Sequence, residues 1–139
     1  MLVVLDTNVL VAAIRSRRGA SFETVSRLAT GAFEPVVSVP LVLEYEDALL
    51  RHAGESGLSP RDIGDLVDYV CAVALQQKIF FLWRPLLKDP KDDMVAEVAV
   101  AAGCHTIVTH NVRDFGGVQR FGIAAITPAG FLRQLRGVK

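Results

Sequence analysis

The sequence has few of the residues that build disulfides or zinc sites. Its 139 residues include two cysteines, Cys71 and Cys104, and three histidines. Both cysteines fall in apolar stretches expected to be helical, without a cysteine or histidine at zinc-ligand spacing. We therefore interpret them as buried, inert thiols in a protein of the reducing cytoplasm.

The sequence also lacks long apolar runs and any excess of charge. No run approaches the roughly 20 apolar residues that cross a membrane. The opening apolar run stops at Asp6 and has no basic region before it, so we do not expect it to be a signal peptide. Fifteen basic residues balance fifteen acidic ones, so a nucleic-acid site would need basic residues gathered on one side. We expect a cytoplasmic protein with no membrane segment.

The sequence does contain apolar residues in an ordered pattern. It is 51% hydrophobic and 22% charged, which is typical of one globular domain over residues 1–139. Apolar runs alternate with helical periodicity, which predicts an α/β fold of three layers, α/β/α, with a mainly parallel central sheet. Strands are expected at 2–6, 34–38, 78–82, 106–109 and 122–126, and helices at 8–15, 20–30, 40 to about 52, 59–74, 94–102 and 128–136.

The first candidate functional residue is Asp6, at the end of the apolar run LVVL. Open α/β sheets bind ligands at the carboxyl ends of their strands. An ionised carboxylate at a buried strand end is costly unless a cation or hydrogen bonds compensate it. The alternative is that Asp6 caps the following helix, although Thr7 or Asn8 could cap it equally well.

Two further acidic features lie in or before helices. Glu44 falls among apolar residues of its helix, and a position at the edge of the apolar stripe is the alternative to a functional role. Asp89, Asp92 and Asp93 crowd the start of the helix expected at 94–102. Helix capping accounts for one or two of them, and three acids within five residues exceed what a cap needs. Asp92 is aligned with small residues that pack closely, so we expect it to point inward, with Asp93 beside it.

The fourth feature is the sequence THNVRDF at 109–115, directly after a predicted strand. Asn111 and Asp114 therefore also lie just past a strand end. A turn built by these two side chains is the alternative interpretation.

Together the four features predict a metal site at one edge of a parallel sheet. Clustered carboxylates repel one another unless a cation lies between them. Oxygen ligands without histidine or cysteine indicate Mg²⁺ or Mn²⁺ rather than zinc. Such a site suits hydrolysis of a phosphodiester by a metal-activated water.

These motifs resemble the PIN domain family, including the VapC-type toxins of bacterial and archaeal toxin–antitoxin pairs. The likeness covers nearly the whole chain. It rests on LDTNVLVAAI at 5–14, the helical Glu44, DPKDD at 89–93, IVTHNVRDF at 107–115 and GIAAITPAGFL at 122–132. The resemblance implies a Mg²⁺- or Mn²⁺-dependent endoribonuclease that acts on RNA as a homodimer or higher homo-oligomer. It also implies a cognate antitoxin protein that holds the enzyme inactive.

The resemblance also assigns roles to residues. The implied catalytic acids are Asp6, Glu44, Asp92 and Asp114, and the implied metal ligands are these four with Asp93 and Asn111. Asp92 is preferred to Asp93 because it lies eleven residues before Gly103, as in similar proteins. Many members have an acid where this chain has Asn111, which leaves one or two metal ions open. Thr7 or Asn8 is expected to orient Asp6.

An RNA backbone also requires basic residues near the acids. Arg15, Arg17 and Arg18 follow the first predicted helix, and Arg113 lies beside the fourth acidic feature. We expect these four to contact phosphates, which makes binding depend on salt. For the first three, a solvated cluster that ends a helix is the alternative.

Three other functions fit parts of the pattern. A haloacid-dehalogenase-like phosphatase would need a second aspartate two residues after Asp6, where this chain has Asn8. A receiver-like signalling domain would need a phosphoacceptor on a central strand and a late lysine after a strand, and neither is apparent. A catalytically silent PIN domain that acts as a binding or scaffold module stays open because of Asn111.

Overall fold

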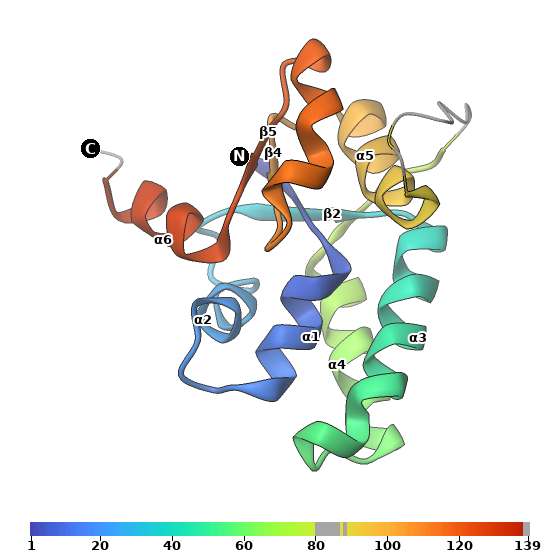
Figure 1. The fold of residues 1–139 in the computed structure, drawn as a ribbon. Coiled ribbons are helices and arrows are strands. Elements are labelled where there is room, and N and C mark those ends of the chain that lie inside the picture. The colour runs from blue at the N-terminus through green and yellow to red at the C-terminus, as the bar shows by residue number, and fades with distance from the viewer. Residues whose placement is uncertain (80–86, 88, 138–139) are drawn as a thin grey trace.

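A computed structural model describes residues 1–79, 87 and 89–137 of the chain, and its centre is a five-stranded parallel sheet (Figure 1). The strands lie in the order β3-β2-β1-β4-β5, and each neighbouring pair is parallel. Their bounds are β1 (Leu2–Leu5), β2 (Glu34–Val37), β3 (Leu75–Gln76), β4 (Thr106–Val108) and β5 (Ala124–Ile126).

Helices flank the sheet. They are α1 (Thr7–Arg15), α2 (Ala20–Ser26), α3 (Val39–Ser56), α4 (Pro60–Val73), α5 (Pro90–Ala102), α6 (Pro128–Gly137) and the 3-10 segment η1 (Val112–Phe121). Figure 1 shows α1, α3 and α4 below β2, with α5 and η1 above it. The predicted α/β fold with a parallel sheet between helices is therefore confirmed.

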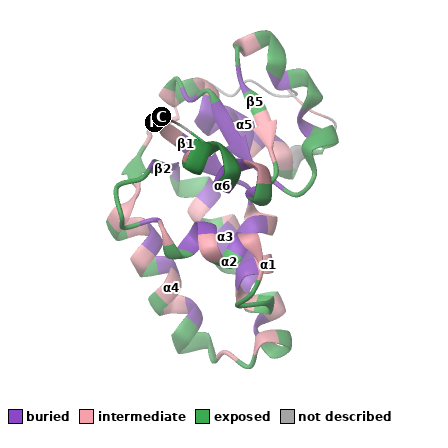
Figure 2. Ribbon diagram, turned by 90° about the vertical axis from the view of Figure 1, so that its left-hand side faces the viewer, coloured by how far each residue is buried: buried purple, intermediate pink, exposed green. Residues whose placement is uncertain are grey.

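The core forms where the apolar strands meet the helices. Val3, Val4 and Ile107 are fully buried in the two central strands. On α5, Ala96 and Ala99 are also fully buried, and their small side chains let this helix pack close to the sheet. Buried residues make up most of β1, β2 and β4, whereas β3 has only exposed residues and β5 has exposed and intermediate ones, as Figure 2 shows for β5.

The strand order creates a crevice beside β1. The chain passes from β1 to β2 and β3 on one side, and then crosses to β4 and β5 on the other. In open parallel sheets, ligands bind at the carboxyl ends of the strands where the winding direction reverses. That point lies between β1 and β4, so Asp6 and Thr109, which directly follow these strands, border it.

The strand expected at 78–82 is wrong in its described part. Lys78 and Ile79 lie outside any strand, while residues 80–82 lie outside the described residues. The strand that pairs with β2 is instead β3, directly after α4. Its two residues are exposed, so β3 has no buried apolar run by which a sequence could reveal it.

Three segments differ from the expected helix bounds because of their caps. Helix α5 begins at Pro90 rather than at 94, since the Asp89 carboxylate accepts the N–H of Lys91 at 2.9 Å. Helix α3 runs to Ser56, and Gly57 ends it with a φ of 75°, a conformation that favours glycine. Helix α2 stops at Ser26, four residues before the expected end at residue 30.

Two further expectations need correction. The segment expected to be a turn after β4 forms the 3-10 segment η1, which is kinked at Phe115. Cys104 is buried as expected, but it follows the helix end at Gly103, and Cys71 is only partly buried. Within the described residues, no helix is both long and apolar enough to cross a membrane.

Candidate active site

Asp6 is buried at the junction of β1 and α1, with 6% of its surface exposed. One carboxylate oxygen accepts the backbone N–H of Thr7 at 2.8 Å, which caps α1. The other accepts the hydroxyl of Thr109 at 2.7 Å. Burial raises the pKa of Asp6, these two hydrogen bonds lower it, and the charge of Asp114 raises it further.

Thr109 is the residue at this junction that the sequence did not predict. It is fully buried at the end of β4, and its hydroxyl also accepts the backbone N–H of Asn111 at 2.9 Å. The amide nitrogen of Asn8 lies 3.5 Å from the same hydroxyl. Asn8 therefore contacts Thr109, which in turn donates to Asp6, whereas Thr7 contacts Asp6 directly through its backbone N–H. The polar residue that ends the neighbouring strand was the signal that could have identified Thr109.

Glu44 is positioned by its neighbour in α3. The buried Tyr45 hydroxyl donates a hydrogen bond to the carbonyl of Leu5, the last residue of β1. Burial raises the pKa of Tyr45 above its ordinary range, so the phenol stays a donor. This bond fixes α3 beside Asp6. The side chain of Glu44, 15% exposed, lies 3.7 Å from the guanidinium of Arg51.

The three acids at the start of α5 have different surroundings. Asp89 caps the helix. Asp93 is buried, and its carboxylate accepts the backbone N–H of Leu87 at 2.7 Å. Asp92 is only partly buried. Burial, followed by the negative charges of Asp6, Asp89, Asp114 and Asp93, raises the pKa of Asp92 to about 6. Acids from three separate segments thus act on this side chain.

A cleft of about 320 Å³ connects several of these groups. The predicted residues that line it are Asp6, Glu44, Asp92, Asn111, Thr7, Asn8 and Arg15. The predicted residues that do not line it are Asp93, Asp114, Arg17, Arg18 and Arg113. Polar lining residues that were not predicted to act here are Asp89, Lys91, Arg51 and His52. The cleft is therefore acidic near β1 and contains several basic groups as well.

The acids that line the cleft are near one another, but their side chains are not arranged around a common point. Among the described residues, no three aspartate, glutamate, histidine or cysteine side chains lie in an arrangement that could hold a metal ion. Local contacts account for part of this spacing. Glu44 is paired with Arg51, and both oxygens of Asp6 accept hydrogen bonds.

The chain is therefore an α/β protein with an open parallel sheet, and an acid-lined cleft lies where the winding of that sheet reverses. More specifically, the chain belongs to the PIN domain family, whose model matches residues 2–113. Members of this family are usually metal-dependent nucleases. This membership decides against the phosphatase and receiver interpretations.

A solved structure supports the same fold. The chain is similar to a chain in the crystal structure of VapBC2 from Rickettsia felis. In that crystal structure, VapBC2 is bound to a DNA fragment from its promoter. The two share 17% sequence identity with a TM-score of 0.64, over 91% of this chain and 98% of the other. No curated protein matches the chain in sequence.

Proposed function

We propose that this protein is a Mg²⁺- or Mn²⁺-dependent ribonuclease that hydrolyses phosphodiester bonds of RNA. The observation that carries the proposal is the cleft beside β1. Asp6 follows a strand, Glu44 lies within α3 and Asp92 lies in the first turn of α5, yet all three line the same cleft. Membership of a family of mostly metal-dependent nucleases supports the same function.

The chemistry of these side chains fits a divalent cation. Carboxylate and amide oxygens are the ligands that Mg²⁺ and Mn²⁺ prefer. The raised pKa of Asp92, about 6, reflects burial and neighbouring negative charge, and a cation would offset that negative charge. When bound, the ion supplies the positive charge that activates a water and stabilises the phosphate.

Each residue then has a separate task. Asp6, Glu44 and Asp92 bind the cation, and Asn111 offers an amide oxygen at the same cleft. Thr109 and the N–H of Thr7 hold the Asp6 carboxylate in a fixed orientation. Such support matters because a ligand that rotates freely loses affinity and geometry.

The direct test is cleavage of labelled single-stranded RNA with Mg²⁺ or Mn²⁺. We expect cleavage by the wild type and a loss of at least about 100-fold in Asp6→Asn and Asp92→Asn. Asp65→Asn is the matched control, because Asp65 is exposed on α4 and does not line the cleft. Equal cleavage by the wild type and Asp6→Asn would show that the proposed site is wrong.

We further propose that the ribonuclease is the toxin of a type II toxin–antitoxin pair and forms a homodimer or higher homo-oligomer. The similarity to a VapBC2 structure supports this assignment. Expression of the wild type should arrest growth, whereas Asp6→Asn should not. Co-expression of a small protein encoded beside the gene should restore growth. Sedimentation of the purified chain tests the oligomer, and a monomer at every concentration would contradict it.

The alternative is a PIN domain that binds without catalysis. Two observations favour it: Asn111 replaces an acid in the cleft, and the described acids lack a metal-holding arrangement. Calorimetry with Mn²⁺ separates the two functions. A silent module would neither bind the ion nor cleave RNA, whereas the ribonuclease would do both.

A further inference from the structure

Basic side chains line the cleft in addition to the acids. Arg15, Arg51 and His52 all line it. Arg15 is the last residue of α1, and the other two lie in the second half of α3. Helices α1 and α3 pack against each other, so these cationic and ionisable groups face the same space as Asp6 and Glu44.

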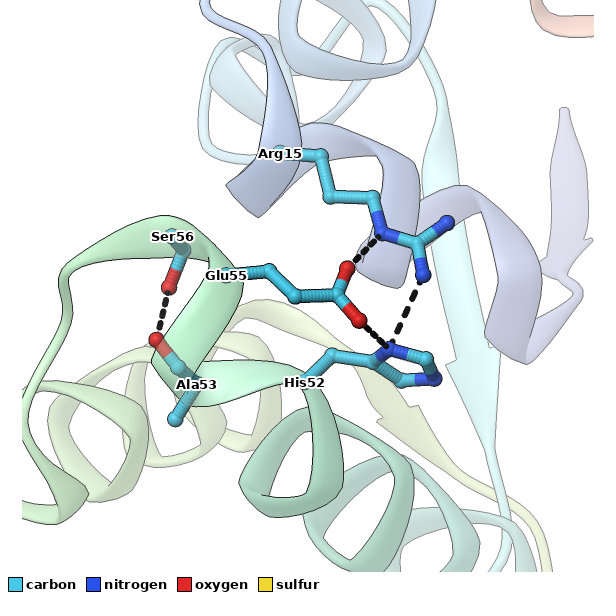
Figure 3. A network of polar contacts seen from close by, with 5 residues as sticks. All are labelled: Arg15, His52, Ala53, Glu55 and Ser56. Carbon is cyan, nitrogen blue, oxygen red and sulfur yellow. Dashed lines mark hydrogen bonds and ion pairs between the residues drawn. The ribbon is translucent and has the colours of Figure 1, made fainter.

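Arg15 is held in this cleft by a network of three side chains (Figure 3). Its Nε donates to Glu55 at 2.7 Å, and its Nη2 lies 2.9 Å from Nδ1 of His52. The same Nδ1 lies 3.0 Å from the other oxygen of Glu55. Because one ring nitrogen either accepts or donates, Nδ1 accepts from Arg15 in one tautomer and donates to Glu55 in the other. Glu55 does not line the cleft, so it holds Arg15 and His52 from outside.

These contacts leave part of the guanidinium available. Arginine carries five N–H groups in a planar fork. Within the described part of the chain, Nε of Arg15 donates to Glu55, and Nη2 donates to His52 in the tautomer whose Nδ1 carries no proton. The Nη1 edge can therefore bind a phosphate oxygen while Glu55 keeps its place. A guanidinium held in this way loses less rotamer freedom on binding an anion than a free one.

Arg51 links the basic end of the cleft to the acidic end. Its guanidinium lies 3.7 Å from Glu44 and 3.4 Å from Asp47, and its side chain is 50% exposed. Both separations are longer than the roughly 2.7–3.2 Å of an ordinary N–H···O hydrogen bond. Glu44 and Arg51 are seven residues apart, which places them on the same side of a helix. Arg51 can therefore turn to a phosphate without breaking a strong contact.

A purely structural role explains this network poorly. The Arg15 and Glu55 side chains are 47% and 53% exposed. Ion pairs between such exposed groups contribute only about 0–1 kcal/mol to stability. The network thus does little to hold α1 against α3, whose contact depends on the buried residues between them.

We propose that Arg15, Arg51 and His52 bind a backbone phosphate of a single-stranded RNA, next to the phosphate that lies at the acids. This inference rests on the proposed function, which supplies the substrate. Asp6 and Arg15 are nine residues apart, or about 14 Å along the axis of a helix. This separation favours a neighbouring phosphate at Arg15 over one phosphate shared by both residues. Glu55 is a positioning residue.

Binding without cleavage tests the subsite. The probe is a labelled ten-nucleotide single-stranded RNA in EDTA, measured by fluorescence anisotropy from 50 to 200 mM KCl. We expect Arg15→Gln and Arg51→Gln each to weaken binding about fivefold at the lowest salt. Each should also reduce the slope of log K against log salt by about 0.7. Arg133→Gln, at an exposed position of α6 outside the cleft, is the matched control.

The outcomes separate this inference from the proposed function. If the wild type cleaves RNA but both arginine variants bind within twofold of it, the subsite is wrong and the ribonuclease stands. If no RNA is cleaved but both variants lose affinity, the subsite stands and the ribonuclease is wrong. Arg51 pairs with Glu44 and Asp47 and not with Glu55. If the Arg15 variant fails to fold, the Arg51 variant therefore still tests the subsite.

Glu55→Gln tests the positioning role separately. We expect a KM for RNA about threefold higher, with kcat and the melting temperature unchanged. In the Arg15→Gln background the same change should have no further effect, because the guanidinium that Glu55 holds is absent. Tighter RNA binding by Glu55→Gln would instead show that this carboxylate only repels the substrate.

Discussion

Asp92→Asn should make the metal-free protein more stable at neutral pH and less sensitive to pH. The pKa of Asp92 rises from its ordinary 3.8 to about 6 in the folded chain. Between these pH values the folded state binds more protons than the unfolded state. Stability therefore falls as pH rises through this window and is greatest below it. Asparagine carries no charge at any of these pH values, so the variant should lack this loss.

The expected magnitude follows from the same shift. Moving a carboxyl pKa from 3.8 to about 6 costs at most about 3 kcal/mol above pH 7. Asp92 is partly exposed, and solvent screening reduces this cost to about 1 to 2 kcal/mol. An ionised aspartate in the first turn of α5 recovers about 0.5 kcal/mol from the helix dipole. The net gain for Asp92→Asn should be about 1 kcal/mol.

The assay is thermal unfolding in EDTA at pH 4.5 and pH 7.5. We expect the variant to melt about 3 °C higher than the wild type at pH 7.5 and to differ little from it at pH 4.5. Asp65→Asn, on the exposed side of α4, should follow the wild type at both. A variant less stable than the wild type at pH 7.5 would refute the reasoning, since it would show that Asp92 contributes mainly to the start of α5.

Three further predictions test the surroundings of the cleft. Adding MgCl₂ at 100 times its Kd should stabilise the wild type by about 2.7 kcal/mol, and Asp6→Asn should not respond in the same titration. Thr109→Val should lower the free energy of unfolding by about 1 to 2 kcal/mol in urea melts at pH 8, because the Asp6 carboxylate loses its 2.7 Å donor. Ser59→Ala should cost about 1 kcal/mol in the same melts, because Ser59 and Asp62 cap α4 reciprocally, but should leave RNA cleavage unchanged.

The fold could be predicted where burial leaves a mark on the sequence. Strand β1 is buried, so it is a continuous apolar run, and the polar triplet after it marks the turn into α1. Both elements were predicted to within one residue at each end. Strand β3 has two exposed residues and leaves no such mark. The sequence predicts the start of α5 four residues after its actual start. The reason is that the capping residue depends on local backbone geometry, which the apolar pattern does not reveal.

The candidate site could be predicted only in part for a related reason. Strand ends and helix starts are visible in the sequence, and they predict that Asp6 and Asp92 lie near each other, in agreement with the cleft that both residues line. The hydroxyl of Thr109 reaches Asp6 across 103 residues, and spacing along the chain does not encode such a contact. Arg51 was within reach of sequence reasoning, since it lies two turns after Glu44 on the same helix.

The choice between helix cap and metal ligand, which the sequence posed for Asp6, is not exclusive. An ionised carboxylate has about four lone-pair sites. Thr7 and Thr109 take one site on each oxygen of Asp6, so each oxygen keeps a site for a cation. The same two bonds fix the direction in which those sites point. Asp93 shows the contrast, because its buried carboxylate binds the Leu87 backbone and does not line the cleft. The capping contact is thus compatible with the proposed ligand role of Asp6, whereas the Asp93 carboxylate is engaged outside the cleft.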